Sequence, residues 1–449
     1  MPHGVGLDPI ENGPRSSRVR PGVHIDVVRP ATTQHGEGLP GLAIRLEMRD
    51  TWRMQDALFT PERRDIVERM TAAAVDFPRR SFDSDRDATF PFENWEDLKR
   101  AGLLGICIPK EHGGLGGDFV AYALASEELG RHCATTGLTF NMHVATTLLV
   151  GQIADDMDLP DDVRATQHAR REQLWHGVVN NHTIHSQPFS EGTAASATGG
   201  FATMAKKVDG GYLVTGRKIF ASLSGAANVH NVVCISDADD QLHLMGVPAD
   251  ADGVEIEGGW DPLGMRGTDS RNLLMTDVFV PEGNEWIPPG MFEQAAWRWP
   301  YFYMTLSFSY LGLMRGILDY TSAYLRGEHG TSARRDNHIK QHGWADMQLT
   351  YDRAQALCYR VLGEASADPS RASLRRAWTS MVTTMQGAPE LASKAIEIAG
   401  GRSMLRPSPL EQAYRDSRAG ATMLPWSVEV CLDRLGRFVL YPESDRFNG

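Results

Sequence analysis

The strongest constraint in this sequence is a change of hydrophobic period that occurs twice along the chain. From about residue 60 to residue 174 the apolar side chains recur at helical spacing, whereas residues 175–290 contain short alternating runs separated by turn residues. After Pro289 the helical period returns and continues to about Tyr441. A period near 3.6 is typical of amphipathic helices and a period of 2 is typical of strands. The sequence therefore predicts a helical domain, a β-domain and a second helical domain, in that order.

Residues 1–48 lie outside this alternation. They are rich in Gly, Pro and Arg and show little periodicity, which is typical of a mobile tail or of an arm that wraps another surface. The tail is the simpler interpretation, so we expect a flexible N-terminal arm. The expected ordered domains are then 49–174, 175–290 and 291–449.

Capping residues indicate where several helices begin. "TPERRDIVERMTAAA" (60–74) opens with Thr-Pro, and Asp118 directly precedes the apolar run "FVAYALASEELGRH". In the middle block, "KKVDGGYLVTGRKIFAS" (206–222) places an Asp-Gly-Gly turn between two alternating runs, which predicts a hairpin within a compact antiparallel β-domain. The further helices that we expect cover 138–154, 298–326, 336–364, 370–399 and 409–439.

Composition and charge restrict the class of partner. The chain of 449 residues has a formal net charge of -12 and a pI of about 5.7, which argues against a nucleic-acid-binding surface. Five cysteines without a CxxC pair argue against a structural metal site or a disulfide framework and fit a reducing cytoplasm. No apolar run reaches the length of a membrane helix and no signal-peptide pattern opens the chain, so we expect a cytoplasmic protein.

Four segments carry a family resemblance. They are "FSEGTAAS" (189–196), "GYLVTGRKIFASLSGAAN" (211–228), "DPLGMRGTDSRNLLMTDVFVP" (261–281) and "AIEIAGGRSMLRPSPLEQAYRDSRAG" (395–420). In this order and spacing they resemble the acyl-CoA dehydrogenase superfamily, over roughly Phe59 to Tyr441. The resemblance implies an α+β protein with an N-terminal helical domain, a central antiparallel β-barrel-like domain and a C-terminal four-helix bundle. It also implies FAD as the cofactor.

The resemblance implies how the flavin ring is held. Ser190, with Phe189 beside it, lies where a Ser/Thr-Glu-Pro motif of the family hydrogen-bonds the ring. Phe220 stands where a tryptophan commonly flanks the ring, and Ser222 where a hydroxyl reaches flavin N5. An aromatic wall and small hydroxyl groups suit a flat, redox-active ring. A core strand residue at Phe220 and a turn residue at Ser222 are the plainer alternatives, and we favour the flavin interpretation.

A second cofactor contact is implied in the C-terminal bundle. Gly400 and Gly401 match a Gly-Gly step whose backbone approaches the FAD of a neighbouring subunit, an approach that glycine permits. Glu397 stands where a glutamine is usual. A cofactor shared between subunits implies a homotetramer or a dimer of dimers. Arg415 and Asp416 match the family's Arg-Asp pair, for which we prefer a structural ion pair to a catalytic role.

The substrate side is implied by matching positions as well. Ser196 corresponds to a serine near the pantetheine or phosphate part of CoA. Arg266, Thr268 and Asp269 lie in a loop that resembles the family's substrate-side segment, with solvated turn residues as the alternative interpretation. We therefore expect a small-molecule substrate, with acyl-CoA as the leading candidate, near Ser196, Arg266 and Thr268.

The usual catalytic base is missing from both of its expected positions. Dehydrogenation of a thioester needs a base for the α-proton, commonly a glutamate ten residues after the tyrosine of the Tyr-Arg-Asp run. Counting from Tyr414 reaches Leu424. The second arrangement of the family, placed by "LGLM" at 311–314, leads to Phe302 in an aromatic segment that contains no acid. Neither Leu424 nor Phe302 can accept a proton.

Two further departures concern the flavin anchor. Gly192 replaces the proline of the Ser/Thr-Glu-Pro motif, while Glu191 keeps its acid. The family's Arg-x-x-Phe-Gly run, whose arginine contacts the FAD pyrophosphate, lacks its Phe-Gly here. Arg326, Arg334 and Arg335 are the candidates to supply that charge. Exchangeable, reduced flavin borrowed from a reductase is compatible with such a weakened anchor.

Three functions are compatible with these departures. The first, and the one we prefer because of the β-domain motifs, is an FAD-dependent acyl-CoA dehydrogenase whose base has moved to Glu397, Glu411 or Glu429, with electron-transfer flavoprotein as the electron acceptor. The second is a two-component monooxygenase that uses reduced flavin and O2, assisted by a histidine. The third is a non-catalytic subunit of a hetero-oligomeric dehydrogenase. The histidines considered for the second are His143, His182 and His185, each of which is more often structural.

Overall fold

The computed structural model describes residues 57–192, 200–292, 295, 306–330, 332–364, 370–423 and 427–441. The predictions for the N-terminal arm and for Ser196, Phe302 and Leu424 lie outside these residues.

The first helical segment has the order α2 (Pro61–Ala73), α3 (Phe77–Asp87), α4 (Phe92–Arg100), α5 (Phe119–His132), α6 (Ala134–Leu148) and α7 (Asp161–Asn180). Both predicted caps are confirmed. Thr60 Oγ1 accepts a hydrogen bond from the N–H of Arg63 at 3.3 Å, and Asp118 Oδ1 accepts one from the N–H of Ala121 at 2.8 Å. The expected helix over 138–154 is α6 followed by a π-helical turn at Leu149–Ile153.

The middle segment forms one sheet in the order β6-β7-β3-β2-β4-β5-β8, with β1 paired to β4. Its strands are β1 (His185–Ser186), β2 (Met204–Val208), β3 (Gly211–Ala221), β4 (Val229–Ser236), β5 (Leu242–Pro248), β6 (Val254–Glu257), β7 (Arg271–Pro281) and β8 (Glu285–Ile287). The predicted hairpin is confirmed, because Val208 pairs with Gly211 across its turn. A purely antiparallel sheet was wrong: β1 and β2 both pair with β4 in parallel. β3 and β4 lie on either side of β2, so the chain between them crosses β2 and does not form a hairpin. This crossover gives β4 the same direction as β2.

The second helical segment contains α11 (Ser307–Arg326), α12 (His338–Gly363), α13 (Arg371–Ala399), α14 (Pro409–Ser417) and α15 (Val428–Leu440). The single helix expected over 409–439 was wrong, since α14 ends at Ser417. The turn after α14 packs closely against α11 and α13, so position 420 has room for glycine but not for a larger residue. A Cβ on Gly420 would lie 2.4 Å from Met385 Sδ and 2.7 Å from the Tyr310 ring.

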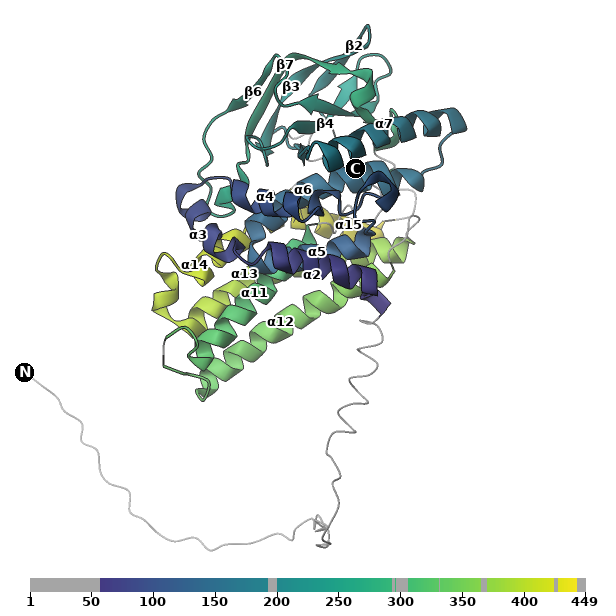
Figure 1. Ribbon diagram of the computed structural model, residues 1–449. Helices are drawn as coiled ribbons and strands as arrows, with labels where there is room; N and C mark the ends of the chain where they lie inside the picture. The colour runs from purple at the N-terminus through teal and green to yellow at the C-terminus, as the bar shows by residue number, and fades with distance from the viewer. Residues whose placement is uncertain are drawn as a thin grey trace, which may run out of the picture. The chain divides into compact units, whose positions relative to one another are not determined.

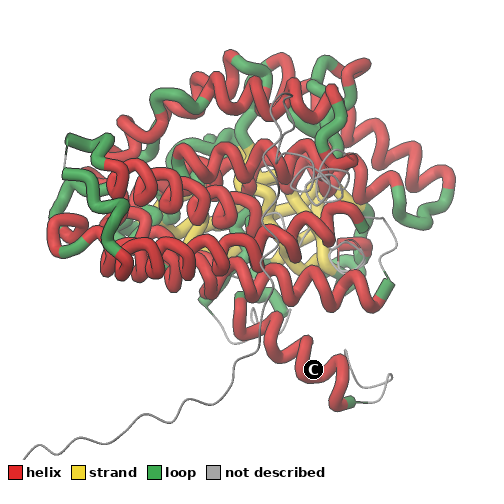
Figure 2. The backbone as a smooth tube through the Cα atoms, turned by 90° about the horizontal axis from the view of Figure 1, so that it is seen from below, coloured by secondary structure: helices red, strands yellow, loops and turns green. Residues whose placement is uncertain are grey.

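The two helical segments share one core, and α5 and α6 connect it to the bundle and to the sheet. α11 packs against α5, α12 and α13, while α6 contacts β1 and α11 (Figure 1). Seen from below, helices lie in front of the strands (Figure 2). The buried Glu127 of α5 ties the layers together by accepting hydrogen bonds from Tyr351 Oη at 2.9 Å and Tyr359 Oη at 2.8 Å. The sheet adds a smaller core of its own around Val232, Met275 and Val278.

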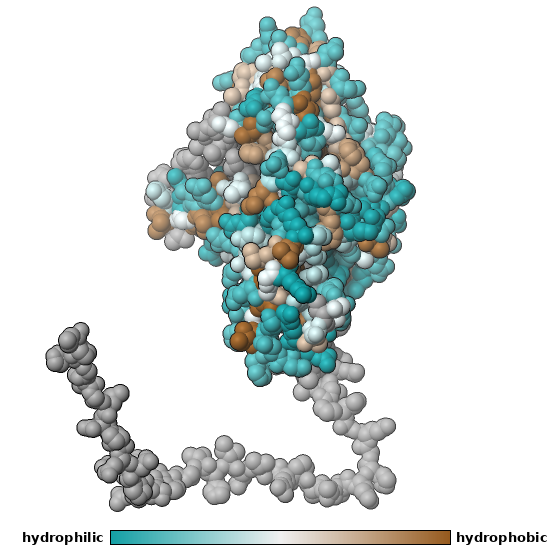
Figure 3. Space-filling model, turned by 90° about the vertical axis from the view of Figure 1, so that its left-hand side faces the viewer, coloured by the Kyte–Doolittle hydropathy of each residue, from teal (hydrophilic) through white to brown (hydrophobic). Residues whose placement is uncertain are grey.

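Large apolar side chains are mostly withdrawn into these cores. The face drawn in Figure 3 is largely hydrophilic, with scattered small hydrophobic areas. All five cysteines are buried and none is in a disulfide, in agreement with the sequence, which argued against a disulfide framework. Among the helices of the described ranges, none has the length and apolar character needed to cross a bilayer.

Candidate active site

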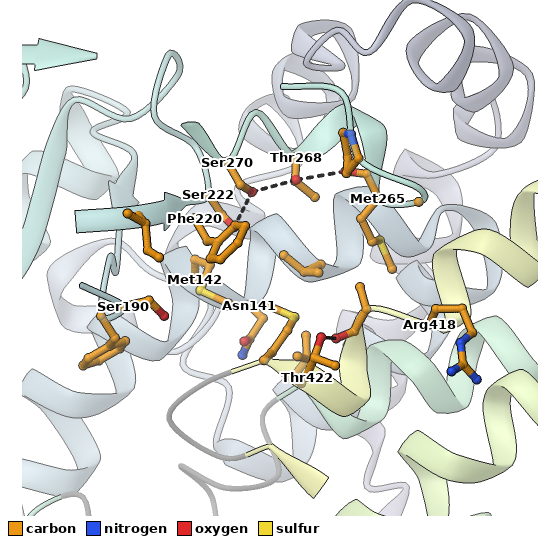
Figure 4. Close-up of a pocket in the computed structure, with 18 of the residues that line it drawn as sticks. Asn141, Met142, Ser190, Phe220, Ser222, Met265, Thr268, Ser270, Arg418 and Thr422 are labelled. Carbon is orange, nitrogen blue, oxygen red and sulfur yellow. Dashed lines mark hydrogen bonds between the residues drawn. The ribbon is translucent and has the colours of Figure 1, made fainter. Parts of the chain in front are cut away.

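A cavity of about 510 Å³ lies where the three segments of the chain meet (Figure 4). α6 contributes one wall, and the strand ends and loops of the sheet contribute a second, including the loop around residues 260–270. α13, α14 and the turn after α14 close the third side. A concave, mostly preformed site between domains is where small ligands and cofactors usually bind.

The cavity wall is predominantly apolar. Five of its side chains are methionines, whose unbranched thioethers adapt to the shape of a bound ligand. They are Met142, Met265, Met381, Met385 and Met423. Among the described lining residues there is no carboxylate and no histidine, and the only charged groups are Arg415 and Arg418. No group of potential metal-ligating side chains occurs in the described part of the chain.

The segment 189–192 is fixed behind the cavity by a buried ion pair. Lys218 Nζ, whose side chain is 0% exposed, donates to Glu191 Oε1 at 2.6 Å. Burial raises the pKa of Glu191, but the charge of Lys218 and the N–H of Ala202 outweigh burial and hold the pKa below its ordinary value. Glu191 therefore points away from the cavity, while its neighbours Ser190 and Gly192 line the cavity.

The replacement of the motif's proline by Gly192 has a conformational reason. Gly192 has φ +72°, which the proline ring cannot adopt. A Cβ there would also approach the side chain of Ile219 to 3.1 Å. The carbonyl of Ser190 accepts a hydrogen bond from the N–H of Ile219 at 2.7 Å, which joins this segment to β3.

A chain of three hydroxyls lies along the second wall (Figure 4). Thr268 donates to the carbonyl of Met265 at 2.9 Å. Its only proton is thereby used, so Ser270 donates to Thr268 at 2.7 Å and Ser222 in turn donates to Ser270 at 2.8 Å. Ser222 consequently presents oxygen lone pairs to the cavity. The ring of Phe220, 64% exposed, stands on the same wall with φ +52°.

The loop that carries this chain is held in an unusual conformation. Met265 and Asp269 both have left-handed φ values, +55° and +46°, which are uncommon for residues with side chains. Asp269 is fixed by Gly225 N–H at 2.9 Å and by the guanidinium of Arg271. Met265 is fixed by the carboxylate of Asp416, which accepts its N–H at 2.5 Å. Strained residues of this kind cluster at ligand sites.

The chain matches three successive family domains. Residues 60–155 match the acyl-CoA dehydrogenase N-terminal domain, residues 186–278 its middle domain and residues 294–424 its C-terminal domain. The chain belongs to the acyl-CoA dehydrogenase family. Membership makes it a flavin-dependent oxidoreductase, and its helix–sheet–helix architecture is the one that the sequence predicted.

Curated relatives of this family are similar along most of the chain. A probable acyl-CoA dehydrogenase, YngJ, of Bacillus subtilis is 26% identical over 74% of this chain and 86% of its own length. The mitochondrial short-chain specific acyl-CoA dehydrogenase of Rattus norvegicus is also 26% identical, over 74% of this chain and 79% of its own.

Solved structures of related proteins share the fold. FMN-bound TdsC from Paenibacillus sp. A11-2 superposes with a TM-score of 0.74 at 21% identity, over 86% of this chain and 100% of the other. A nitrososynthase from Micromonospora carbonacea var. africana gives a TM-score of 0.72 at 22% identity, over 86% and 98% of the two chains. At this level of identity the likeness concerns the architecture alone.

The structure brings five residues that the family resemblance singled out into one cavity. Phe189, Ser190, Phe220, Ser222 and Thr268 all line it, from positions far apart in the sequence. Arg266 does not line it. The guanidinium of Arg266 contacts Asp261 and the carbonyl of Asp85, so its described contacts hold the loop and leave its predicted ligand role without support.

The proposed replacement bases lie elsewhere. Glu397 is 67% exposed and pairs with Lys394, whereas Glu411 pairs with Arg406 and Arg415. Glu429 lies exposed in the first turn of α15. None of the three is among the cavity-lining residues.

The histidines near α6 are structural in their contacts. His143 Nε2 donates to the carbonyl of Leu104 at 3.0 Å, and its Nδ1 accepts the N–H of His185 at 3.1 Å. Burial lowers the pKa of His143 to about 4 and that of His185 to about 3, so both rings are neutral at neutral pH. His182 is exposed, and none of the three lines the cavity.

Arg415 has the structural role that the sequence favoured, with different partners. It donates to both carboxylate oxygens of Asp85 at 2.7 and 2.6 Å and also pairs with Glu411, so that it joins α14 to α3. Asp416 does not pair with Arg415; it holds Met265 instead.

Gly400 and Gly401 lie apart from the cavity, at the end of α13. A Cβ on either glycine would meet no atom of the described chain within 4 Å, so their backbone faces open space. Of the three candidate arginines, Arg334 is the one beside them: it donates to the carbonyl of Ala399 at 3.4 Å. Arg326 is paired with Glu328.

Proposed function

We propose that the cavity holds the flavin ring and its substrate, and that the protein is a two-component monooxygenase acting on a largely apolar substrate. The overall reaction consumes reduced flavin and O2; one oxygen atom enters the substrate and the other leaves as water. The observation that carries the proposal is the composition of the cavity wall. Its described residues supply apolar contacts, hydroxyls, two amides and two arginines, but no carboxylate or histidine that could take an α-proton.

The described residues fit a flavin at this place. Phe220 offers an exposed aromatic face, and Met142 and Ile219 extend the apolar wall. Ser190 and Ser222 bring hydroxyls to the same wall. A bound flavin supplies the electron transfer, while these residues orient the ring and exclude water from one side of it.

Among these residues, Ser222 has the largest effect on which redox state of the flavin is bound. Since its proton is committed to Ser270, its lone pairs favour a ligand that donates a hydrogen bond. The reduced flavin ring carries an additional N–H compared with the oxidised ring. The hydroxyl chain therefore favours binding of reduced flavin, as a protein supplied by a separate flavin reductase requires.

Assembly and partners follow from the same proposal. The open backbone at Gly400 and Gly401, with Arg334 beside it, suits the phosphates of a flavin bound mainly by a neighbouring subunit. A homotetramer or a dimer of dimers would complete the site in this way. A flavin reductase is the expected partner of a monooxygenase, and electron-transfer flavoprotein that of a dehydrogenase.

The second candidate function is α,β-dehydrogenation of an acyl-CoA. It is favoured by the curated acyl-CoA dehydrogenases, which are 26% identical over 74% of this chain. It requires a base that the described cavity wall does not provide, and donors for the thioester carbonyl.

An anaerobic titration separates the two functions. The purified protein is loaded with FAD or FMN and mixed with acyl-CoAs of increasing chain length in the absence of O2, while flavin absorbance and enoyl products are followed. We expect no bleaching of the flavin. The flavin is then reduced chemically and mixed with O2, and we expect a transient absorbance that belongs to neither oxidised nor reduced flavin. Bleaching with an enoyl product would establish the dehydrogenase, and failure to bind either flavin would indicate a non-catalytic subunit.

A further inference from the structure

Two buried side-chain amides line the cavity. Asn141, in the middle of α6, is 3% exposed, and Gln187, two residues before the segment 189–192, is 7% exposed. Burial of an amide without hydrogen-bond partners is unfavourable, so each polar atom of these two groups needs a partner in the protein or in a ligand. Among the described residues, only one end of each amide has a hydrogen-bond partner.

The orientation of Gln187 is fixed by its neighbour Thr146. The hydroxyl of Thr146 donates its single proton to the carbonyl of Met142 at 3.4 Å. Its oxygen can therefore only accept, and it does so from Asn231 Nδ2 at 2.9 Å and from Gln187 Nε2 at 3.0 Å. Gln187 must present its NH2 to Thr146, which leaves Oε1 without a partner among the described residues.

Asn141 has the same arrangement, with its NH2 group bound to the protein and its carbonyl oxygen left for a ligand. Its Nδ2 donates to the hydroxyl oxygen of Tyr122 at 2.9 Å, behind the cavity wall. No described residue donates to its Oδ1. The carbonyl end of a nine-tenths buried amide is thus available to a molecule in the cavity. In Figure 4 Asn141 and Met142 lie below the hydroxyl chain that begins at Ser222.

Asn141 Oδ1, Gln187 Oε1 and the lone pairs of Ser222 are all acceptors. They lie in a predominantly apolar wall, whose charged donors, Arg415 and Arg418, are contributed by α14 and the turn after it. A thioester carbonyl is itself only an acceptor and gains nothing from such groups. A ligand with N–H or O–H groups satisfies them, and one that lacks these donors leaves buried acceptors unpaired.

We propose that Asn141 and Gln187 form an acceptor subsite that selects largely apolar ligands bearing an N–H or O–H donor. Phenols, indoles and hydroxylated or aminated ring compounds belong to this class. The inference rests on the proposed function in that it takes the cavity as the ligand site. The donor has two possible sources, the imide N–H of the flavin or an N–H or O–H of the substrate, and the experiment separates them.

The test compares probes that differ only in the donor. Indole is paired with N-methylindole, and 2-naphthol with 2-methoxynaphthalene, and each is titrated by calorimetry into the full-length, flavin-loaded protein without reductant. We expect the donor of each pair to bind about tenfold more tightly than its methylated counterpart, the effect of one buried hydrogen bond. This measurement needs no variant and involves no turnover, so it is independent of whether the monooxygenase reaction is correct.

Variants then locate the subsite. Asn141→Leu and Gln187→Met keep the size of each side chain and remove its acceptor, and Leu138→Met, which also lines the cavity from α6, is the matched control without a hydrogen-bond change. We expect the two acceptor variants to reduce the preference for the donor probe to nearly equal affinities, while Leu138→Met keeps the wild-type ratio. Circular dichroism checks that each variant is folded.

The outcomes separate the sources of the donor. Loss of the probe preference with unchanged flavin affinity assigns the acceptors to the substrate. An unchanged preference with flavin affinity lowered about tenfold in either variant assigns that acceptor to the flavin. The proposal is overturned if wild-type protein binds both members of each pair equally and neither variant changes flavin affinity.

Discussion

The carboxylate of Asp416 accepts a hydrogen bond from the backbone N–H of Met265 at 2.5 Å, although the two residues are 151 positions apart. Met265 has φ +55° and begins the loop that carries Thr268 and Ser270. One buried side chain of the helical bundle thus fixes the conformation of the loop that forms a cavity wall. The contact explains how a rare backbone conformation is maintained at the site.

We expect this contact to give the protein a specific pH dependence. Burial is the main cause that raises the pKa of Asp416 from 3.8 to about 7 in the folded protein. Because the folded state holds the proton more tightly than the unfolded chain, the contribution to stability is fully present below pH about 4 and is lost as the pH rises through about 7. Asp416→Asn cannot ionise and should lose this part of the pH dependence. The difference in unfolding free energy between wild type and Asp416→Asn should change by about 1–4 kcal/mol over that window.

Urea unfolding at several pH values from 4 to 8 measures this difference. Asp319→Asn is a suitable control, since Asp319 is a half-exposed residue whose ion pair with Arg131 lies away from the cavity. A constant difference between wild type and Asp416→Asn across the range would contradict the assignment of the buried proton to Asp416.

Removal of the middle hydroxyl of the chain should change the redox preference of the site. In Ser270→Ala the proton of Ser222 loses its acceptor and turns to the cavity, where it stabilises a hydrogen-bond acceptor in place of a donor. We expect the reduction potential of bound flavin to fall by about 20–40 mV, the equivalent of one hydrogen bond. Ser224→Ala is the control, because Ser224 donates to the carbonyl of Asp269 on the same loop but does not line the cavity. Equal potentials in both variants would show that the chain does not bias the flavin.

Much of this site was accessible from the sequence because its residues occur in ordered motifs. Ser190, Phe220, Ser222 and Thr268 were each identified from a short segment, and the structure places them around one cavity. Local signals also predicted the helix that Asp118 caps, because a cap depends only on residues a turn away.

The groups that were missed depend on contacts between distant segments. Ser270 joins the hydroxyl chain only because β3 and β7 are neighbours, and Gln187 is oriented by Thr146 of α6. Neither relationship leaves a mark on local periodicity. Asn141 did carry a signal, as an amide in a helix whose residues are otherwise almost all buried. A buried polar residue in an apolar helix is a reasonable indication of a ligand site.

The buried ion pair between Lys218 and Glu191, behind the segment 189–192, should be essential for the stability of the protein. Lys218→Met leaves the carboxylate of Glu191 buried without its cation, which typically costs about 3–5 kcal/mol. The double variant Lys218→Met/Glu191→Gln removes both charges and should recover part of that loss. Arg217→Met provides the control, since its ion pair with Glu257 is half-exposed and worth at most about 1 kcal/mol. Chemical denaturation of the four proteins checks the order; a double variant less stable than Lys218→Met would contradict an uncompensated charge as the cause.

The open backbone at the end of α13 offers a test of the shared cofactor site. Gly401→Ala meets no described atom within 4 Å, so it should leave the stability of the subunit unchanged within about 0.5 kcal/mol. If a flavin of a neighbouring subunit approaches this backbone, the added methyl group should nevertheless weaken flavin binding by about tenfold or more. Gly363→Ala serves as the control, because Gly363, at the end of α12, also has open space around its Cβ position. Flavin affinity and unfolding are measured on the same preparations. A Gly401→Ala protein that binds flavin as tightly as wild type would exclude Gly401 from the cofactor site. It would also remove the support for Arg334 as the arginine that contacts the flavin phosphates.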